Sequence, residues 1–208
     1  MKKFLFFLQL IAVIALSSCT DDPLPDPNTN GNANEVDNTI IVYMPWSGDP
    51  YSLYDYFKTN LRDMKQAIVN EGGLGNKRLV VFISEAPEKG ALINVKYQSG
   101  QCVDDTLAKF DNTQPNLQLN TSRWITNLLT RVKAYAPARN YSMIVGCHGM
   151  GWIPSYAGTR TSVSNTLQKR WRDVESKPLT RWFGGDTYKT DISILDRGIA
   201  QSGIGKMQ

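Results

Sequence analysis

The residues best suited to chemistry lie in the segment His148-Gly149-Met150-Gly151-Trp152. An imidazole gains and loses a proton near neutral pH, so His148 is a candidate general base or acid. A glycine beside it allows a substrate to approach the backbone closely, and the N–H of Gly149 is a candidate donor to an oxyanion. On residue chemistry alone, a structural role explains the segment equally well: His148 would then only donate a hydrogen bond to a loop carbonyl.

Few other residues offer chemistry. The sequence has one histidine and three cysteines, Cys19, Cys102 and Cys147, with no CxxC pair, which excludes multi-histidine metal sites and structural zinc. We expect no cofactor: calcium would be possible, but no acidic cluster of suitable spacing supports it. The motifs GxSxG and GxxxxGK[ST] are absent, which argues against a serine hydrolase and a nucleotide-binding loop.

The composition is that of a globular protein. The chain has 208 residues, of which 41% are hydrophobic, 10% aromatic and 20% charged, and its net charge is +4. These values exclude disorder throughout and a polytopic membrane protein. The 23 basic residues are spread along the chain among 19 acidic ones, so we expect no nucleic-acid partner. The oligomeric state cannot be predicted.

The N-terminus has the pattern of an export signal. Lys2 and Lys3 precede an apolar run over residues 4–16 that is too short to span a bilayer comfortably. The run ends in Leu-Ser-Ser-Cys, which resembles a bacterial lipobox, so we expect a lipoprotein signal peptide at 1–18 and a lipid anchor on Cys19. An ordinary signal peptide with an incidental cysteine is the alternative. Residues 19–37, rich in Pro, Asn and Asp, are expected to form a flexible stalk. The predicted location is the bacterial cell envelope, at the outer membrane or cell surface.

The body of the chain alternates strands and helices. Apolar runs at 38–46, 77–84 and 141–147 predict buried strands, and helical spacing predicts amphipathic helices over 53–68, 124–132 and 192–199. Ser52, Thr121 or Ser122, and Thr190 or Asp191 are the candidate N-caps. Residues 92–98 predict one strand of a peripheral hairpin. This order predicts an open α/β sheet whose ligands bind beyond the carboxyl ends of the strands, where His148 lies.

Three segments, NTIIVYMPW, LVVFISE and SMIVGCHGMGW, resemble the clostripain family of cysteine peptidases in order and spacing. The resemblance covers about residues 38–208. It implies a caspase-like α/β/α sandwich with a mainly parallel sheet, and cleavage of protein or peptide substrates after Arg or Lys. By this resemblance His148 is the catalytic histidine and Gly149 helps to form the oxyanion hole. Trp152 is expected beside the cleft, in contact with the substrate.

The family carries its nucleophilic cysteine in an Asp-x-Cys motif on the strand that follows the last predicted helix. That motif is absent here. We therefore expect residues 38–208 to be a partial peptidase domain truncated before the nucleophile strand, as in a fragment, a frame-disrupted product or a partial gene. Such a chain should be inactive alone. The alternative is a non-catalytic surface lipoprotein that binds a ligand and retains the fold.

Neither Cys102 nor Cys147 is predicted to replace the nucleophilic cysteine. Side chains alternate along a strand, so Cys147 should face the helix layer while His148 faces the cleft. A Cys102–Cys147 disulfide is a further hypothesis for an oxidising compartment. Trp46, Trp124 and Trp182 are expected to serve packing.

The segment 153–185 has no long periodic run and predicts a loop. Its cations are compatible with two roles. They could be sites at which a complete enzyme cleaves its own exposed loop, or they could form a solvated basic surface. The cations are Arg160, Lys169, Arg170, Arg172, Lys177 and Arg181.

Overall fold

The computed structural model describes residues 35–45, 53–87, 89–110, 119–149, 153–154, 179–184 and 189–205. Several predicted features lie outside these residues. They include the signal peptide at 1–18, the lipidation site Cys19, most of the stalk, Trp46, Ser52, Trp152 and the loop cations from Arg160 to Lys177. In the part of the chain that is described, no helix is long and apolar enough to cross a membrane.

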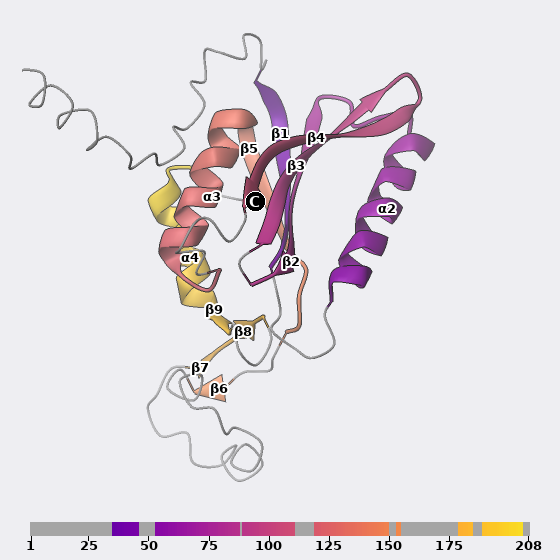
Figure 1. Cartoon of the computed structure of the whole chain (residues 1–208). Helices are drawn as coiled ribbons and strands as arrows, with labels where there is room; N and C mark the ends of the chain where they lie inside the picture. The colour runs from indigo at the N-terminus through magenta and orange to yellow at the C-terminus, as the bar shows by residue number, and fades with distance from the viewer. Residues whose placement is uncertain are drawn as a thin grey trace, which may run out of the picture. The chain divides into compact units, whose positions relative to one another are not determined.

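A five-stranded sheet forms the centre of the fold, in the order β4-β3-β2-β1-β5. Its strands β1, β2 and β5 are parallel, and β3 and β4 extend it as an antiparallel hairpin. The predicted α/β sheet with a parallel centre is thus confirmed (Figure 1). The strands are β1 (Val36–Met44), β2 (Lys77–Ala86), β3 (Lys89–Gln98), β4 (Gln101–Phe110) and β5 (Ala138–Val145).

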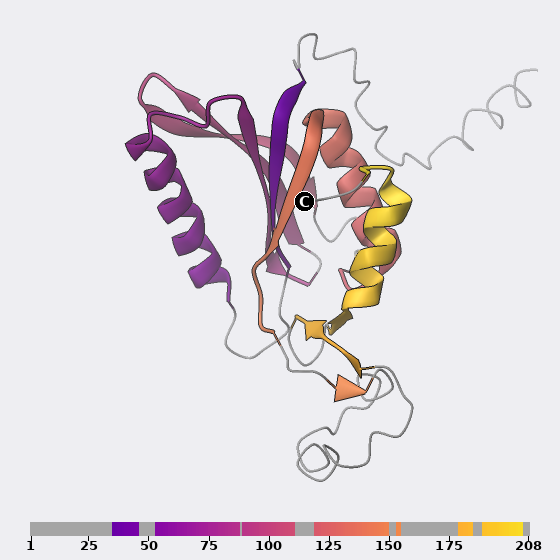
Figure 2. The same cartoon turned by 180° about the vertical axis from the view of Figure 1, so that it is seen from behind.

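Helices cover both faces of this sheet. Helix α2 (Tyr54–Asn70) lies on one face, and α3 (Ser122–Tyr135) and α4 (Ile192–Ser202) lie on the other (Figures 1 and 2). The three layers form an α/β/α sandwich, as expected.

Two of the helix caps are those that the sequence predicts. The side chain of Thr121 accepts a hydrogen bond from the N–H of Trp124 at 3.2 Å, and that of Asp191 accepts one from Ser193 at 2.7 Å. Helix α2 instead has Leu53 at its N-cap, and no side chain caps it.

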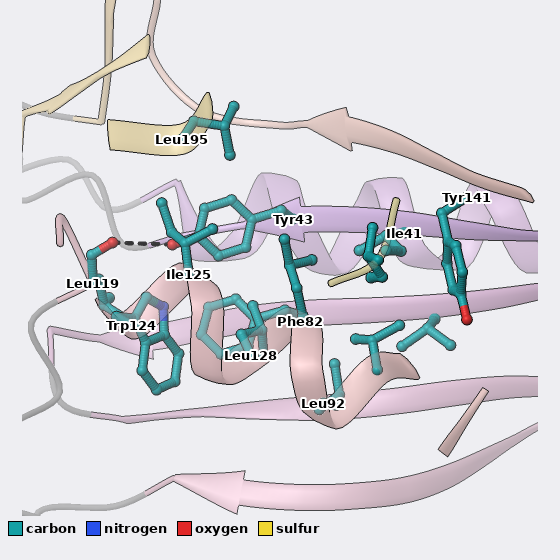
Figure 3. Packing of buried hydrophobic residues seen from close by; sticks show 14 of the residues in the cluster. Ile41, Tyr43, Phe82, Leu92, Leu119, Trp124, Ile125, Leu128, Tyr141 and Leu195 are labelled. Carbon is teal, nitrogen blue, oxygen red and sulfur yellow. Dashed lines mark hydrogen bonds between the residues drawn. The ribbon is translucent and has the colours of Figure 1, made fainter. Parts of the chain in front are cut away.

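An aromatic cluster fills the face below α3 and α4. The rings of Tyr43 and Phe82 stack at 5.4 Å between centroids, and Trp124 meets Phe82 edge-on at 5.5 Å. The hydroxyl of Tyr43 donates to the carbonyl of Leu119 at 3.1 Å (Figure 3). Because Tyr43 is fully buried, its pKa is raised and it stays neutral. This cluster fixes the carboxyl-end halves of β1 and β2 against α3.

The opposite face is mainly aliphatic and is covered by α2. Phe57 and Leu61 of the helix pack in one cluster with Val42 and Met44 of β1. The apolar spacing that predicts α2 therefore describes its buried side correctly, since the residues three and four apart point to one face.

Three strand boundaries differ from the prediction. Strand β1 begins at Val36, two residues before the predicted strand start at 38. Strand β5 runs over Ala138–Val145 rather than 141–147. It begins earlier because Pro137 can directly precede a strand, and it ends earlier because the ladder to β1 ends near Val145. The hairpin strand predicted at 92–98 is longer, and its partner β4 was not predicted.

Four two-residue strands lie in the described parts of the predicted loop and just after it. They form two small antiparallel pairs, β6 with β7 and β8 with β9, and Figure 1 shows β8 and β9 close to the start of α4. The strands are β6 (Ile153–Pro154), β7 (Leu179–Thr180), β8 (Trp182–Phe183) and β9 (Thr190–Asp191).

Candidate active site

Strand β5 delivers His148 to the carboxyl end of the parallel sheet. The last ladder bond to β1 runs from the N–H of Gly146 to the carbonyl of Tyr43, at 2.9 Å. The next bond of a parallel ladder would need an N–H at residue 45, and Pro45 has none. The pairing with β1 therefore stops here, and His148 lies two residues beyond it, with an exposed side chain.

Alternation along β5 continues to Cys147. The side chains of Tyr141, Met143, Val145 and Cys147 all pack with the cluster under α3 and α4. These odd-numbered positions share one face, and a Cβ on the even-numbered Gly146 would meet Met44, which packs on the other face. The predicted orientation of Cys147 toward the helix layer is confirmed.

The thiol of Cys147 is poorly suited to nucleophilic attack. Burial raises its pKa to about 11, although the N–H of Gly184, 3.3 Å from Sγ, favours the thiolate. At neutral pH the sulfur is therefore protonated, and it packs in the cluster under α3 and α4.

Cys102 is far from both residues in the fold. It lies on β4, at the opposite edge of the sheet from β5, and packs with the cluster under α2. Cys102 and Cys147 are free thiols on opposite faces of the sheet. The predicted disulfide between them is therefore wrong, because bridged cysteines need Cα atoms within about 7 Å.

The two glycines beside Cys147 and His148 have different surroundings. A Cβ on Gly146 would lie 3.2 Å from Cγ of the buried Met44, whereas a Cβ on Gly149 would meet no atom within 4 Å. Packing thus favours glycine at 146. The fold imposes no such restriction at Gly149, which is exposed.

A short strand that the sequence analysis did not single out holds this segment. Gly149 forms an antiparallel bridge with Phe183 of β8, and the N–H of Gly184 donates to the carbonyl of His148 at 3.0 Å. In this pattern the backbone groups of Gly149 point away from β8, so its N–H is not used for the bridge. The only signal in the sequence was an aromatic pair followed by two glycines, and nothing in it indicated a pairing with residue 149.

The remaining site predictions have mixed outcomes. Trp124 and Trp182 are buried, which confirms the packing role expected for them. Trp152 lies outside the described residues. Within the described ranges, no three His, Cys, Asp or Glu side chains gather in a group able to hold a metal ion.

Comparisons with known proteins complete this description. No family model matches the chain, and no curated protein matches it. Among solved structures, a secreted C11 cysteine protease from Bacteroides thetaiotaomicron, iotapain, is 29% identical with a TM-score of 0.62, over 81% of this chain and 43% of that one. This chain therefore spans less than half the length of that relative.

Two further structures support the same assignment. A second C11 protease from B. thetaiotaomicron, bound to an irreversible peptide inhibitor, is 19% identical with a TM-score of 0.55, over 80% of this chain and 39% of that one, and shows the same fold. A clostripain from the same organism, bound to a peptide inhibitor, is 31% identical with a TM-score of 0.51. The match covers 58% of this chain and 97% of that one. Sequence motif, fold and identity agree, and the chain belongs to the C11, or clostripain, family of cysteine proteases.

Proposed function

We propose that this chain supplies the histidine part of a clostripain-type cysteine endopeptidase. The observation that carries the proposal is the position of His148, which is exposed directly beyond the carboxyl end of β5, the parallel strand next to β1. Ligands of open α/β sheets bind at this end. The adjacent Cys147 packs toward α3 and α4 and keeps its proton, so we propose that the reactive thiolate comes from another part of the protease.

The proposed reaction is acyl transfer. A thiolate attacks the peptide carbonyl, and His148 gives a proton to the leaving amine as the C–N bond breaks. Water then attacks the thioester, His148 takes a proton from that water, and the C–S bond breaks to release the acid product and restore the thiolate. The N–H of Gly149 is directed away from β8 and is proposed to donate to the oxyanion in both steps.

Substrate preference and location are part of the proposal. We propose cleavage after Arg or Lys, with Trp152 at the rim of the substrate cleft. The relatives in complexes are bound to peptide inhibitors, which supports a peptide substrate for this chain as well. We place the protease in the cell envelope, anchored by lipid on Cys19. The description of a relative as secreted is compatible with export.

The experiment compares two proteins. One is the 208-residue chain, and the other is the same chain continued through the reading frame that follows codon 208. Both are assayed on fluorogenic peptides that differ only in the residue before the scissile bond, with Arg, Lys, Glu or Leu there.

We expect thiol-dependent hydrolysis of the Arg and Lys peptides by the continued protein and none by the 208-residue chain. Thiol-dependent turnover by the short chain that is lost in Cys147→Ala would overturn the assignment of Cys147. If the continued reading frame has no Asp-x-Cys and cleaves no peptide, the alternative of a binding lipoprotein that retains the fold replaces the peptidase.

A further inference from the structure

Residues 147–149, which include His148, follow the last ladder bond to β1 in the described part of the chain. Pro45 ends the ladder from β1, and the following residues 147–149 would otherwise extend from the sheet without backbone pairing. General acid–base catalysis requires the imidazole to lie within hydrogen-bond reach of the substrate, so the backbone that carries it has to be held in place.

Strand β8 provides the replacement partner. The N–H of Gly184 is shared between two acceptors, the carbonyl of His148 at 3.0 Å and the sulfur of Cys147 at 3.3 Å. The bridge between Gly149 and Phe183 extends this pairing by one residue. Gly184 has φ of 89°, a region in which residues with a Cβ are strained, so glycine suits this end of β8.

Strand β8 is itself firmly attached to the core. Phe183 is 8% exposed and meets the ring of Tyr43 edge-on, at 6.4 Å between centroids. Phe183 also pairs with the buried Thr190 of β9, and the N–H of Ile192 at the start of α4 donates to the carbonyl of Arg181 at 3.0 Å. A continuous set of contacts therefore joins the backbone of His148 to α4.

We propose that β8 positions His148, and that Phe183, Gly184 and Cys147 are positioning residues for it. Phe183 anchors β8 in the core, and Gly184 connects it to the His148 carbonyl. The sulfur of Cys147 is the second acceptor of the same N–H. This inference rests on the catalytic role proposed for His148, and it assigns Cys147 a structural task in place of a nucleophilic one.

The single histidine of the chain makes the test direct, because ¹³C,¹⁵N-histidine labelling reports one imidazole only. Uniform ¹⁵N labelling of a second sample reports the backbone amide of Gly184. In the full chain we expect one sharp imidazole signal and slow hydrogen exchange at the amide of Gly184. Phe183→Ala should broaden the imidazole signal and speed exchange at Gly184 by about tenfold or more, as expected when a local opening becomes easier.

Cys147 is tested by a conservative pair. Cys147→Ala removes one of the two acceptors and should raise the exchange rate of Gly184 about fivefold, the scale of one hydrogen bond. Cys147→Ser keeps an acceptor and should restore most of the protection. The matched control is Leu61→Ala, since Leu61 is also 8% exposed but lies on α2, in the cluster on the opposite face of the sheet. It should lower the Tm and leave both signals unchanged.

Unchanged imidazole and Gly184 signals in folded Phe183→Ala and Cys147→Ala proteins would overturn the proposal. If Phe183→Ala does not fold, Phe183→Leu is measured in its place. None of these readouts requires activity, so the positioning role can fail while His148 proves catalytic, and the catalytic role can fail while the positioning role holds.

Discussion

Gly146 and Gly149 lie three residues apart, and the structure gives them different surroundings. Gly146 packs against Met44 under the α2 face, so its small size serves the fold. Gly149 has open space where a Cβ would lie, so packing does not require its small size. The two positions therefore differ in what a Cβ would cost the fold.

This difference predicts opposite effects of alanine. Gly146→Ala should lower the free energy of unfolding by about 1 to 2 kcal/mol, because Met44 is buried and must move. Gly149→Ala should leave it unchanged or raise it by up to about 1 kcal/mol through the lower entropy of the unfolded chain. Urea denaturation of the two variants measures both values. A large loss of stability in Gly149→Ala alone would contradict this account of the segment.

The thiol of Cys147 gives a second prediction at this scale. With its pKa raised from 9.0 to about 11, Cys147 has about 100-fold less thiolate at pH 8 than an ordinary cysteine. In a chain carrying Cys19→Ser and Cys102→Ser, alkylation by iodoacetamide should therefore be slow at pH 8 and should still rise above pH 9. Its pH profile is compared with that of unfolded chain in urea. A rate that levels off near pH 9 in the folded chain would show that the thiol is not shielded.

At the scale of elements, the apolar spacing predicted the sheet and its covering helices well. Strands such as β2 are apolar on both faces because helices cover both, and helices such as α3 carry one apolar stripe. The edge strand β4 was missed because its polar residues fit an exposed hairpin as well as a loop, and there they form ion pairs such as Lys96–Asp105 at 2.5 Å. The pairing of β8 with residue 149 was also missed, because the paired residues are 34 positions apart in the sequence. Such a pairing depends on tertiary packing, which a local sequence pattern does not report.

The contact between α3 and α4 is the closest between helices in the described chain and carries a third prediction. A Cβ on Gly198 would lie 2.5 Å from Cγ2 of the fully buried Ile125, so α4 would have to move away. Although alanine favours a helix, Gly198→Ala should lower the free energy of unfolding by at least about 1 kcal/mol.

Two further variants decide whether this contact is the cause. The loss should be smaller when Ile125→Ala is already present, as a double-mutant cycle would measure. Ser193→Ala, at an exposed position of the same helix, should change stability by no more than about 0.5 kcal/mol. Additive losses from Gly198→Ala and Ile125→Ala would contradict the packing described for this pair.

At the scale of the molecule, the lipobox-like N-terminus predicts a tethered protein. Multiple acyl chains hold a protein at a membrane because each buried CH₂ contributes about 0.8 kcal/mol. Cells expressing the chain should incorporate labelled palmitate into it, and Cys19→Ala should abolish the label while Cys102→Ala retains it. Equal labelling of the Cys19→Ala protein would exclude Cys19 as the anchor.

The central claim is that His148 performs the proton transfers of a cysteine peptidase. Its most direct test is kcat/KM on an Arg or Lys peptide for the protein continued past residue 208, with His148→Ala and with Arg139→Ala as the control. Arg139 is an exposed residue at the amino end of the same strand, in an ion pair with Asp37 at 3.3 Å. We predict a loss of about 100-fold to 10,000-fold for His148→Ala and no more than a twofold change for Arg139→Ala. A His148→Ala protein that is folded and retains kcat/KM within tenfold of the parent would contradict the claim.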